Sequence, residues 1–246
     1  LLSLINEIGL KEDIIELPDK IDYKLRMGNG YETENKLDLD DLLEQAINNS
    51  SKMSKDKLMN MTFFQFLIIS FDFETAQFIK DSFGYDAEII HLNAHAAITM
   101  FKEDLFKDNK YFILKNGLSS IIEKLEEIIK KKKNIIIKKK TVLKEIQDKH
   151  IKTEKGDKFN FHKLILTIPS EKIKKLEYFK ENPHIDSVKP IKLLRIYAQY
   201  PTKDLWFKKI NRTITDNYIR HVIPIDYKNG IIMISYTDDK YCELWE

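Results

Sequence analysis

The sequence predicts an α+β protein that combines a helical subdomain with a mixed β-sheet. Up to about residue 106, apolar residues recur at three- and four-residue steps, which is typical of amphipathic helices. Beyond residue 110, short apolar runs alternate with turn residues, as they do in strands. The chain has 246 residues, of which 43% are hydrophobic, so it is long enough to bury a substantial core.

The first part of the chain carries its own helix boundaries. The segment LLSLINEIGL (1–10) has apolar residues at helical spacing and reaches Gly9, a residue typical of helix C-termini. Ser54 is a good N-cap for the segment that follows it. The aromatic-rich residues 62–83 predict helix that stops at Gly84.

The pattern changes near residue 110. Residues 118–131 predict an amphipathic helix with glutamates in its first half and lysines in its last turn, which complements the helix dipole. Ile135–Ile137 predicts a three-residue apolar strand. Residues 141–162 predict two strands joined by the turn KTEKGDK, and KLILTI (163–168) predicts a buried strand that ends at Pro169.

The last part of the chain predicts a sheet. KLLRIYAQYP (192–201) is expected to form a strand. HVIPID (221–226) and GIIMISYTD (230–238) are separated by YKNG, which predicts a β-hairpin. Nearer the start, YKLRMGNGYET (23–33) predicts two short strands around a turn at Gly28–Gly30.

A lysine-rich tract raises the question of a nucleic-acid or membrane surface. Seven lysines lie between residues 130 and 140, but the chain as a whole has 41 Lys+Arg against 39 Asp+Glu, a net charge of +2. Proteins built around polyanion binding usually show a larger imbalance. The tract also lacks interleaved aromatic residues. We therefore expect a solvated surface and no nucleic-acid partner, and keep a basic nucleic-acid-associated protein as a third hypothesis.

Several classes of protein are not favoured. The single cysteine, Cys242, allows no intrachain disulfide, which fits a reducing compartment such as the cytoplasm. No apolar run approaches the roughly 20 residues of a membrane helix, so no membrane partner is expected. His91 and His95 lie four apart without the acidic residue of HExxH, and no metal site is expected. Heavy use of Lys, Ile and Asn indicates an AT-rich coding sequence.

The order of the segments resembles the middle portion of the flavin-containing amine oxidase family, which includes monoamine and polyamine oxidases. In that family a GG-small-x-x-L turn opens a helix, an x-x-V-x-x-I strand follows, and a later strand ends in Ala-x-Pro. The corresponding residues here are Asn116–Gly117–Leu118, Val142 and Thr167–Ile168–Pro169. Residues 190–207 resemble the family's later strand, and the likeness is collinear over almost the whole chain.

The resemblance implies three parts. Residues 1–109 would be the helical part of the substrate domain, residues 110–170 a segment of the FAD-binding domain, and residues 171–246 the mixed-sheet part of the substrate domain. The family's GxGxxG unit does not occur in this sequence. We therefore expect a middle portion of a longer protein that holds FAD only in its complete form, because a glycine-rich turn and a helix N-terminus bind the pyrophosphate.

The resemblance also implies which residues contact the cofactor. Gly117 belongs to the turn that opens the helix. Val142 would contact the FAD adenosine through its backbone, and Thr167 and Ile168 would lie near the flavin. The family's second turn glycine is Asn116 here, which weakens the turn. Without a cofactor, all of these residues also suit ordinary strand and turn positions.

Arg195 aligns with the family's lysine that holds a water beside the flavin N5, so it is the candidate catalytic residue. An arginine stays charged and cannot serve as a neutral base, but it can position a water or a carboxylate. Strand alternation puts Tyr197 and Gln199 on the same face, and both are candidate substrate-binding residues. A surface arginine on a strand remains the alternative.

The function implied is part of an FAD-dependent amine oxidoreductase, which oxidises the C–N bond of a small-molecule amine to an imine with the flavin as hydride acceptor. The chain by itself is expected to be inactive. The alternative is a catalytically inactive, oxidase-like structural or interaction protein. Its signs would be Arg195 in place of lysine and the weakened glycine turn.

Overall fold

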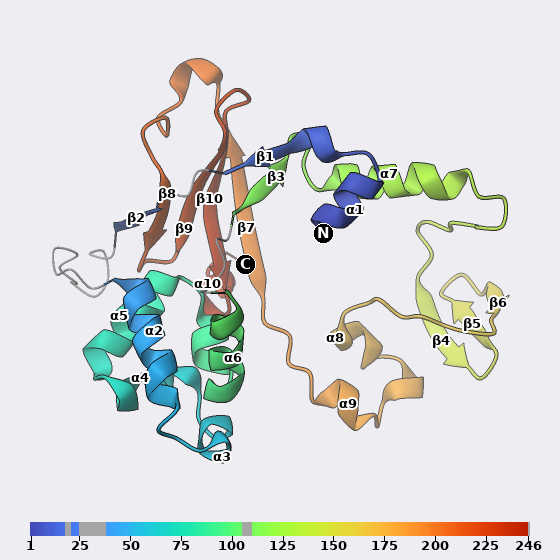
Figure 1. The fold of residues 1–246 in the computed structure, drawn as a ribbon. Helices are drawn as coiled ribbons and strands as arrows, with labels where there is room; N and C mark the ends of the chain where they lie inside the picture. The colour runs from blue at the N-terminus through green and yellow to red at the C-terminus, as the bar shows by residue number, and fades with distance from the viewer. Residues whose placement is uncertain (18–20, 25–37, 105–109, 246) are drawn as a thin grey trace. The chain divides into compact units, whose positions relative to one another are not determined.

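The computed structural model describes residues 1–17, 21–24, 38–104 and 110–245. They form two compact units (Figure 1). The small unit combines Leu1–Lys11 with Leu118–Pro190, and the large unit combines Glu12–Gly117 with Ile191–Glu246. The α+β class expected from the sequence is confirmed. The assignment of residues 1–109, 110–170 and 171–246 to substrate and FAD domains stays a prediction.

The described helices in the first half of the large unit pack together beyond one end of its main sheet (Figure 1). They are α2 (Leu39–Ser50), α3 (Lys55–Met59), α4 (Phe63–Ser70), α5 (Phe73–Phe83), the π-helix η2 (Ala87–His91) and α6 (Ala94–Asp104). Their core is aromatic and aliphatic: Phe63, Phe66 and Ile79 are fully buried. This burial is the main stabilisation of the helical part.

Local capping sets the helix ends. Ser54 caps α3 as predicted, since its Oγ accepts the Lys57 N–H at 3.4 Å. The helical segment before Gly84 is divided, because Asp72 opens α5 by accepting the Thr75 N–H at 2.7 Å. Gly84 then ends α5 as predicted, with a φ of +83° that favours glycine.

A five-stranded mixed sheet forms the other half of the large unit. Its strands, in spatial order, are β2 (Ile21–Lys24), β8 (Arg212–Thr215), β9 (His221–Asp226), β10 (Ile231–Asp238) and β7 (Leu193–Gln199). β2 pairs with β8 in parallel, and the other pairs are antiparallel. The predicted hairpin at YKNG is confirmed as β9–β10. The predicted turn at Gly28–Gly30 lies outside the described residues.

Smaller elements complete the large unit. They are β1 (Ile14–Glu16), its antiparallel partner β3 (Phe112–Leu114), η4 (Thr202–Asp204) and α10 (Lys240–Glu243), while η1 (Lys11–Asp13) spans the boundary between the units. Leu205, Phe207 and Ile232, the last from β10, form a second buried cluster. Within the described ranges, no helix has the length and apolar character needed to cross a membrane.

The small unit contains two helices near its start and a short three-stranded antiparallel sheet. The elements are α1 (Leu2–Glu7), α7 (Ser119–Lys130), β4 (Leu143–Gln147), β5 (His150–Thr153), β6 (Lys158–Asn160), α8 (Ser170–Ile173), η3 (Glu177–Phe179) and α9 (Pro183–Asp186). The helix predicted over 118–131 is confirmed as α7. The predicted KTEKGDK turn joins β5 to β6, and a second tight turn separates β4 from β5.

Two predicted strands are wrong. Ile135–Ile137 and residues 163–168 form no strand, and each run has an apolar side chain that faces solvent, with Ile136 82% and Ile165 86% exposed. An apolar run becomes a strand when a neighbouring backbone pairs with it and its side chains are buried. Within the described part of the chain, neither run has such a neighbour.

The lysine tract is partly neutralised by α7. Lys139 and Lys130 form ion pairs with Glu126 at 2.8 and 2.9 Å. Hydrogen bonds from Lys139 and Lys130 lower the pKa of Glu126 to about 2. Lys138 lies over the ring of Phe159, 4.8 Å from its centroid. These contacts are those of a charged protein surface, and the absence of a nucleic-acid partner stays a prediction.

Candidate substrate site

The large unit contains a cavity of about 540 Å³ over the sheet, which we call the arginine–tyrosine cavity. Its apolar wall consists of Ile15, Leu17, Ile210, Ile223, Pro224 and Ile225. Its aromatic and polar wall consists of Tyr85, Tyr111, Tyr227, Tyr236, Glu16, Asn211, Arg195 and Arg212. A mostly apolar cavity with a few polar groups is typical of small-molecule sites.

Arg195 reaches this cavity from β7. It lies opposite Tyr236 of β10 in the antiparallel register, so both side chains leave the same face of the sheet. The Arg195 Nη2 donates a hydrogen bond to the Tyr236 hydroxyl at 2.8 Å, and its Cζ lies 4.4 Å from the centroid of the Tyr236 ring. The hydrogen bond to Tyr236 raises the pKa of Arg195. The guanidinium therefore stays charged and its direction is fixed.

Tyr85, which follows α5, links the cavity to a buried histidine. Its ring stacks on His221 with centroids 4.5 Å apart and meets Tyr236 edge-on at 5.0 Å. Burial and the neighbouring Tyr236 raise the pKa of Tyr85, so its hydroxyl stays neutral. Burial, aided by Arg212 and Arg220, lowers the pKa of His221 to about 3. His221 is thus a neutral packing group at neutral pH.

Arg212 is the second guanidinium of the cavity. Its Cζ lies 5.1 Å from the centroid of the Tyr111 ring, a cation–π distance. Its Nε is shielded from solvent and has no hydrogen-bond partner among the residues that the structure describes. Glu16 lines the same cavity, but its carboxylate pairs with Lys110 at 2.9 Å.

The predicted substrate-binding residues share the face of Arg195 but lie beyond the cavity lining. Along β7, exposure alternates so that Arg195, Tyr197 and Gln199 are all exposed. Tyr197 is 52% exposed, and the Gln199 Nε2 donates to the Asn229 carbonyl at 3.1 Å. Their role in binding substrate stays a prediction.

The predicted cofactor residues are accessible at their own positions. Gly117 has a φ of +79° and open space where a Cβ would stand, so its turn requires glycine and leaves room for a ligand. In the small unit, Val142 is 54% exposed while its carbonyl accepts the Glu154 N–H at 3.0 Å. Thr167 and Ile168 are also exposed. Exposed apolar side chains gain free energy when covered, so these residues fit contact with a flavin.

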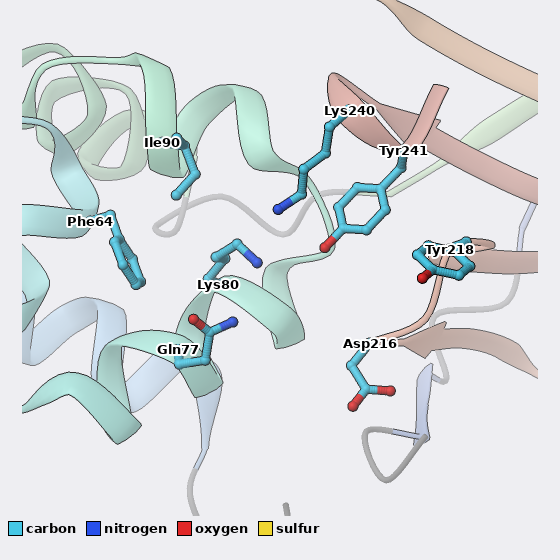
Figure 2. Close-up of a pocket in the computed structure, with 8 residues that line it drawn as sticks. All are labelled: Phe64, Gln77, Lys80, Ile90, Asp216, Tyr218, Lys240 and Tyr241. Carbon is cyan, nitrogen blue, oxygen red and sulfur yellow. The ribbon is translucent and has the colours of Figure 1, made fainter. Parts of the chain in front are cut away.

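A second cavity of about 460 Å³ lies in the large unit, which we call the lysine cavity. It is lined by Phe64, Gln77, Lys80, Ile90, Asp216, Tyr218, Lys240 and Tyr241. Figure 2 shows the ends of Lys80, Lys240 and Tyr241 pointing toward one another, while the carboxylate of Asp216 points away. Both lysines pair with Asp86, each at 3.6 Å, and Lys80 also pairs with Asp81 at 3.3 Å, so each lysine has a carboxylate partner.

The lysine cavity borders a buried ionic cluster, consisting of Lys80, Asp81, Asp86, Arg220 and Asp238. Arg220 is fully buried and donates to the carbonyls of Lys80, Asp81, Gly84 and Thr215 at 2.9–3.3 Å. The Asp238 carboxylate accepts the N–H groups of Asp86 and Ala87 at 3.0 and 2.7 Å. The cluster therefore fastens the end of α5 and the start of η2 to the sheet.

The sequence pointed to Arg195 but missed the residues that accompany it. Arg212 lies in β8, a strand with only four residues that no alternating pattern marks. Tyr85 and Tyr111 lie next to element ends, where single-sequence patterns say little about side-chain direction. Tyr236 lies in a predicted strand, but its register against β7 depends on a pairing between distant segments.

Comparison with known proteins gives the class and then the family. Residues 1–244 match the family model of flavin containing amine oxidoreductases, so the chain belongs to that family. The fold is that of amine-oxidase-like flavoproteins, and the family's flavin agrees with the FAD expected from the sequence. No curated protein matches the chain significantly.

A solved structure supports the same fold. The chain is similar to the crystal structure of a CLA-producing fatty acid isomerase from P. acnes, with a TM-score of 0.54 and 14% sequence identity. The likeness covers 95% of this chain and 61% of the isomerase chain. The chain therefore spans less than two thirds of the length of that protein. At this low sequence identity, the similarity concerns the fold only.

Proposed function

We propose that this chain is the substrate-binding portion of an FAD-dependent oxidoreductase that oxidises the C–N bond of an amine to an imine. The observation that carries the proposal is the arginine–tyrosine cavity, whose apolar and aromatic walls enclose about 540 Å³ beside Arg195, the position where the family carries a lysine. A bound flavin would accept the hydride from the substrate carbon. The chain would supply orientation and exclusion of water.

The cavity residues suit these two tasks. The rings of Tyr85 and Tyr236 meet at 5.0 Å and form a rigid aromatic wall for the apolar body of a substrate. The guanidinium of Arg195 keeps its proton, so it acts by directed hydrogen bonds to a water or a substrate oxygen and not as a base. Gly117, Val142, Thr167 and Ile168 are the residues proposed to contact the cofactor.

The test uses the full-length protein that contains this chain, purified with its cofactor. Mixing it without oxygen with benzylamine, phenethylamine, spermine and phenylalanine should bleach the flavin absorbance with at least one of them. A folded, colourless protein, or a yellow protein whose flavin none of these amines reduces, would contradict the proposal and support the inactive, oxidase-like alternative that Arg195 suggests.

A further inference from the structure

Two cations of the arginine–tyrosine cavity have no carboxylate partner among the residues that the structure describes. The guanidinium of Arg195 contacts the ring and hydroxyl of Tyr236, and that of Arg212 contacts the ring of Tyr111. No further hydrogen bond or ion pair joins either arginine to a residue that the structure describes, and the Arg212 Nε is buried without a hydrogen-bond acceptor. A shielded N–H of a charged group without an acceptor costs free energy. A ligand that supplies the acceptor would recover this cost.

The remaining groups of the cavity do not balance these charges. Glu16 is engaged by Lys110 at 2.9 Å, and the hydroxyl of Tyr85 stays neutral because burial raises its pKa. In the lysine cavity of the same unit, by contrast, Asp86 pairs with both lysines. Arg195 and Arg212 are therefore the charged groups in the described lining of this cavity that have no partner of opposite charge.

We propose that the arginine–tyrosine cavity binds the carboxylate of a ligand with an apolar or aromatic body, held by the guanidiniums of Arg212 and Arg195. Guanidinium groups match carboxylates through paired, charge-assisted hydrogen bonds. The aliphatic wall of Ile15, Ile223 and Ile225 suits the apolar body. This inference rests on the proposed function and narrows its substrate to an amine that also carries a carboxylate, as an apolar amino acid does.

The test compares an acid with its uncharged amide. Isothermal titration of the full-length protein with 3-phenylpropionate and with 3-phenylpropanamide should show the acid binding more than about tenfold tighter, because charge-assisted hydrogen bonds are lost with the amide. Equal affinities would overturn the inference. This comparison uses the unsubstituted protein, so it does not depend on the folding of any variant.

Variants then assign the contact to the two arginines. Arg212→Gln and Arg195→Gln should each weaken binding of 3-phenylpropionate more than about tenfold and leave binding of the amide within about threefold. Lys203→Gln is the matched control, since Lys203 is exposed in η4 and lies outside the cavity lining. The inference would be overturned if the arginine variants lost no more affinity for 3-phenylpropionate than Lys203→Gln does, or if Arg212→Gln lost none.

The outcomes for ligand class and for function are separable. Flavin reduction by phenethylamine together with no binding of 3-phenylpropionate would contradict the carboxylate site and leave the amine oxidoreductase standing. Arginine-dependent binding of 3-phenylpropionate together with no flavin reduction by phenylalanine or phenethylamine would support the carboxylate site and contradict the proposed reaction.

Discussion

The two cavities of the large unit differ in how their positive charges are balanced. In the lysine cavity, Lys80 and Lys240 both pair with Asp86, and the adjacent Arg220 is surrounded by carbonyls and Asp81. In the arginine–tyrosine cavity, aromatic rings and one hydroxyl surround the guanidiniums. Cations with carboxylate partners thus line one cavity, and cations that contact aromatic groups line the other.

This difference has a consequence for mutations. Removing a cation whose partners are buried leaves those partners without hydrogen bonds, which lowers the free energy of unfolding. Removing a cation that faces a cavity leaves only rings and water behind. Substitutions in the ionic cluster should therefore lower stability, and substitutions in the arginine–tyrosine cavity should alter binding or catalysis.

The largest effect on the free energy of unfolding is expected from substitution of Arg220. Arg220→Met would leave four backbone carbonyls without their donor and Asp81 with Lys80 as its remaining cationic partner, at a cost of about 3–5 kcal/mol in the free energy of unfolding. Urea denaturation followed by circular dichroism measures this cost. Arg195→Met is the matched control and should cost about 1 kcal/mol or less. Equal losses in the two variants would remove the distinction between the cavities.

Gly84 tests the packing between the ionic cluster and the arginine–tyrosine cavity. Its φ is +83°, and a Cβ at this position would stand 2.4 Å from the His221 Nε2. Gly84→Ala should cost about 2–4 kcal/mol from backbone strain and overpacking together. Gly156→Ala has a similar φ of +89° but open space around the Cβ, and should cost only about 1–2 kcal/mol. Denaturation curves of the two variants give the difference, and equal costs would show that His221 moves aside freely.

Local signals in the sequence were sufficient for much of the large unit. Ser54 and Gly84 mark helix ends by chemistry that acts within a few residues, and YKNG marks the hairpin in the same way. The strands predicted at 135–137 and 163–168 failed because an apolar run carries no information about whether another backbone will pair with it. Pairing and burial belong to the tertiary structure.

The sequence predicted only part of the candidate site, because the rest depends on tertiary structure. Arg195 was predicted from a resemblance to a family position, but its partner Tyr236 is 41 residues away in the chain and meets it through strand register. Arg212 and Tyr111 come together across 101 positions of sequence. No periodicity in either segment predicts that meeting, so the placement of both arginines beside one cavity emerges only in three dimensions.

The buried His221 should make stability depend on pH. Its pKa is about 3 in the folded state, against about 6.5 in an unfolded chain, so the unfolded state binds more protons between these values. The contribution of His221 is fully present above pH 6.5 and is lost as pH falls, by about 1.4 kcal/mol for each pH unit. Between pH 7.5 and 5, this single group should remove about 2 kcal/mol.

The measurement compares denaturation of the wild type and His221→Gln at both pH values. Glutamine does not titrate, so the difference in free energy of unfolding between the two proteins cancels contributions from other groups. One such group is Asp238, because burial raises the pKa of its carboxyl. The charged neighbours that lower the pKa of His221 are Arg212 and Arg220. Parallel pH dependence in the two proteins would show that His221 is not held neutral by its surroundings.

The smallest effect on stability and the clearest effect on activity are expected at Arg195. Arg195→Ala removes one hydrogen bond and one cation–π contact, both to Tyr236 on a partly exposed face, and should cost about 1 kcal/mol or less. If Arg195 positions a water or a substrate oxygen beside the flavin, the same change should slow flavin reduction about ten- to hundredfold, because a charge-assisted hydrogen bond is lost. Arg195→Lys should keep part of the rate, since the family carries lysine at this position. Stopped-flow reduction of the full-length protein separates these effects, and a rate in Arg195→Ala equal to that of the wild type would assign Arg195 to the sheet surface and end its catalytic role.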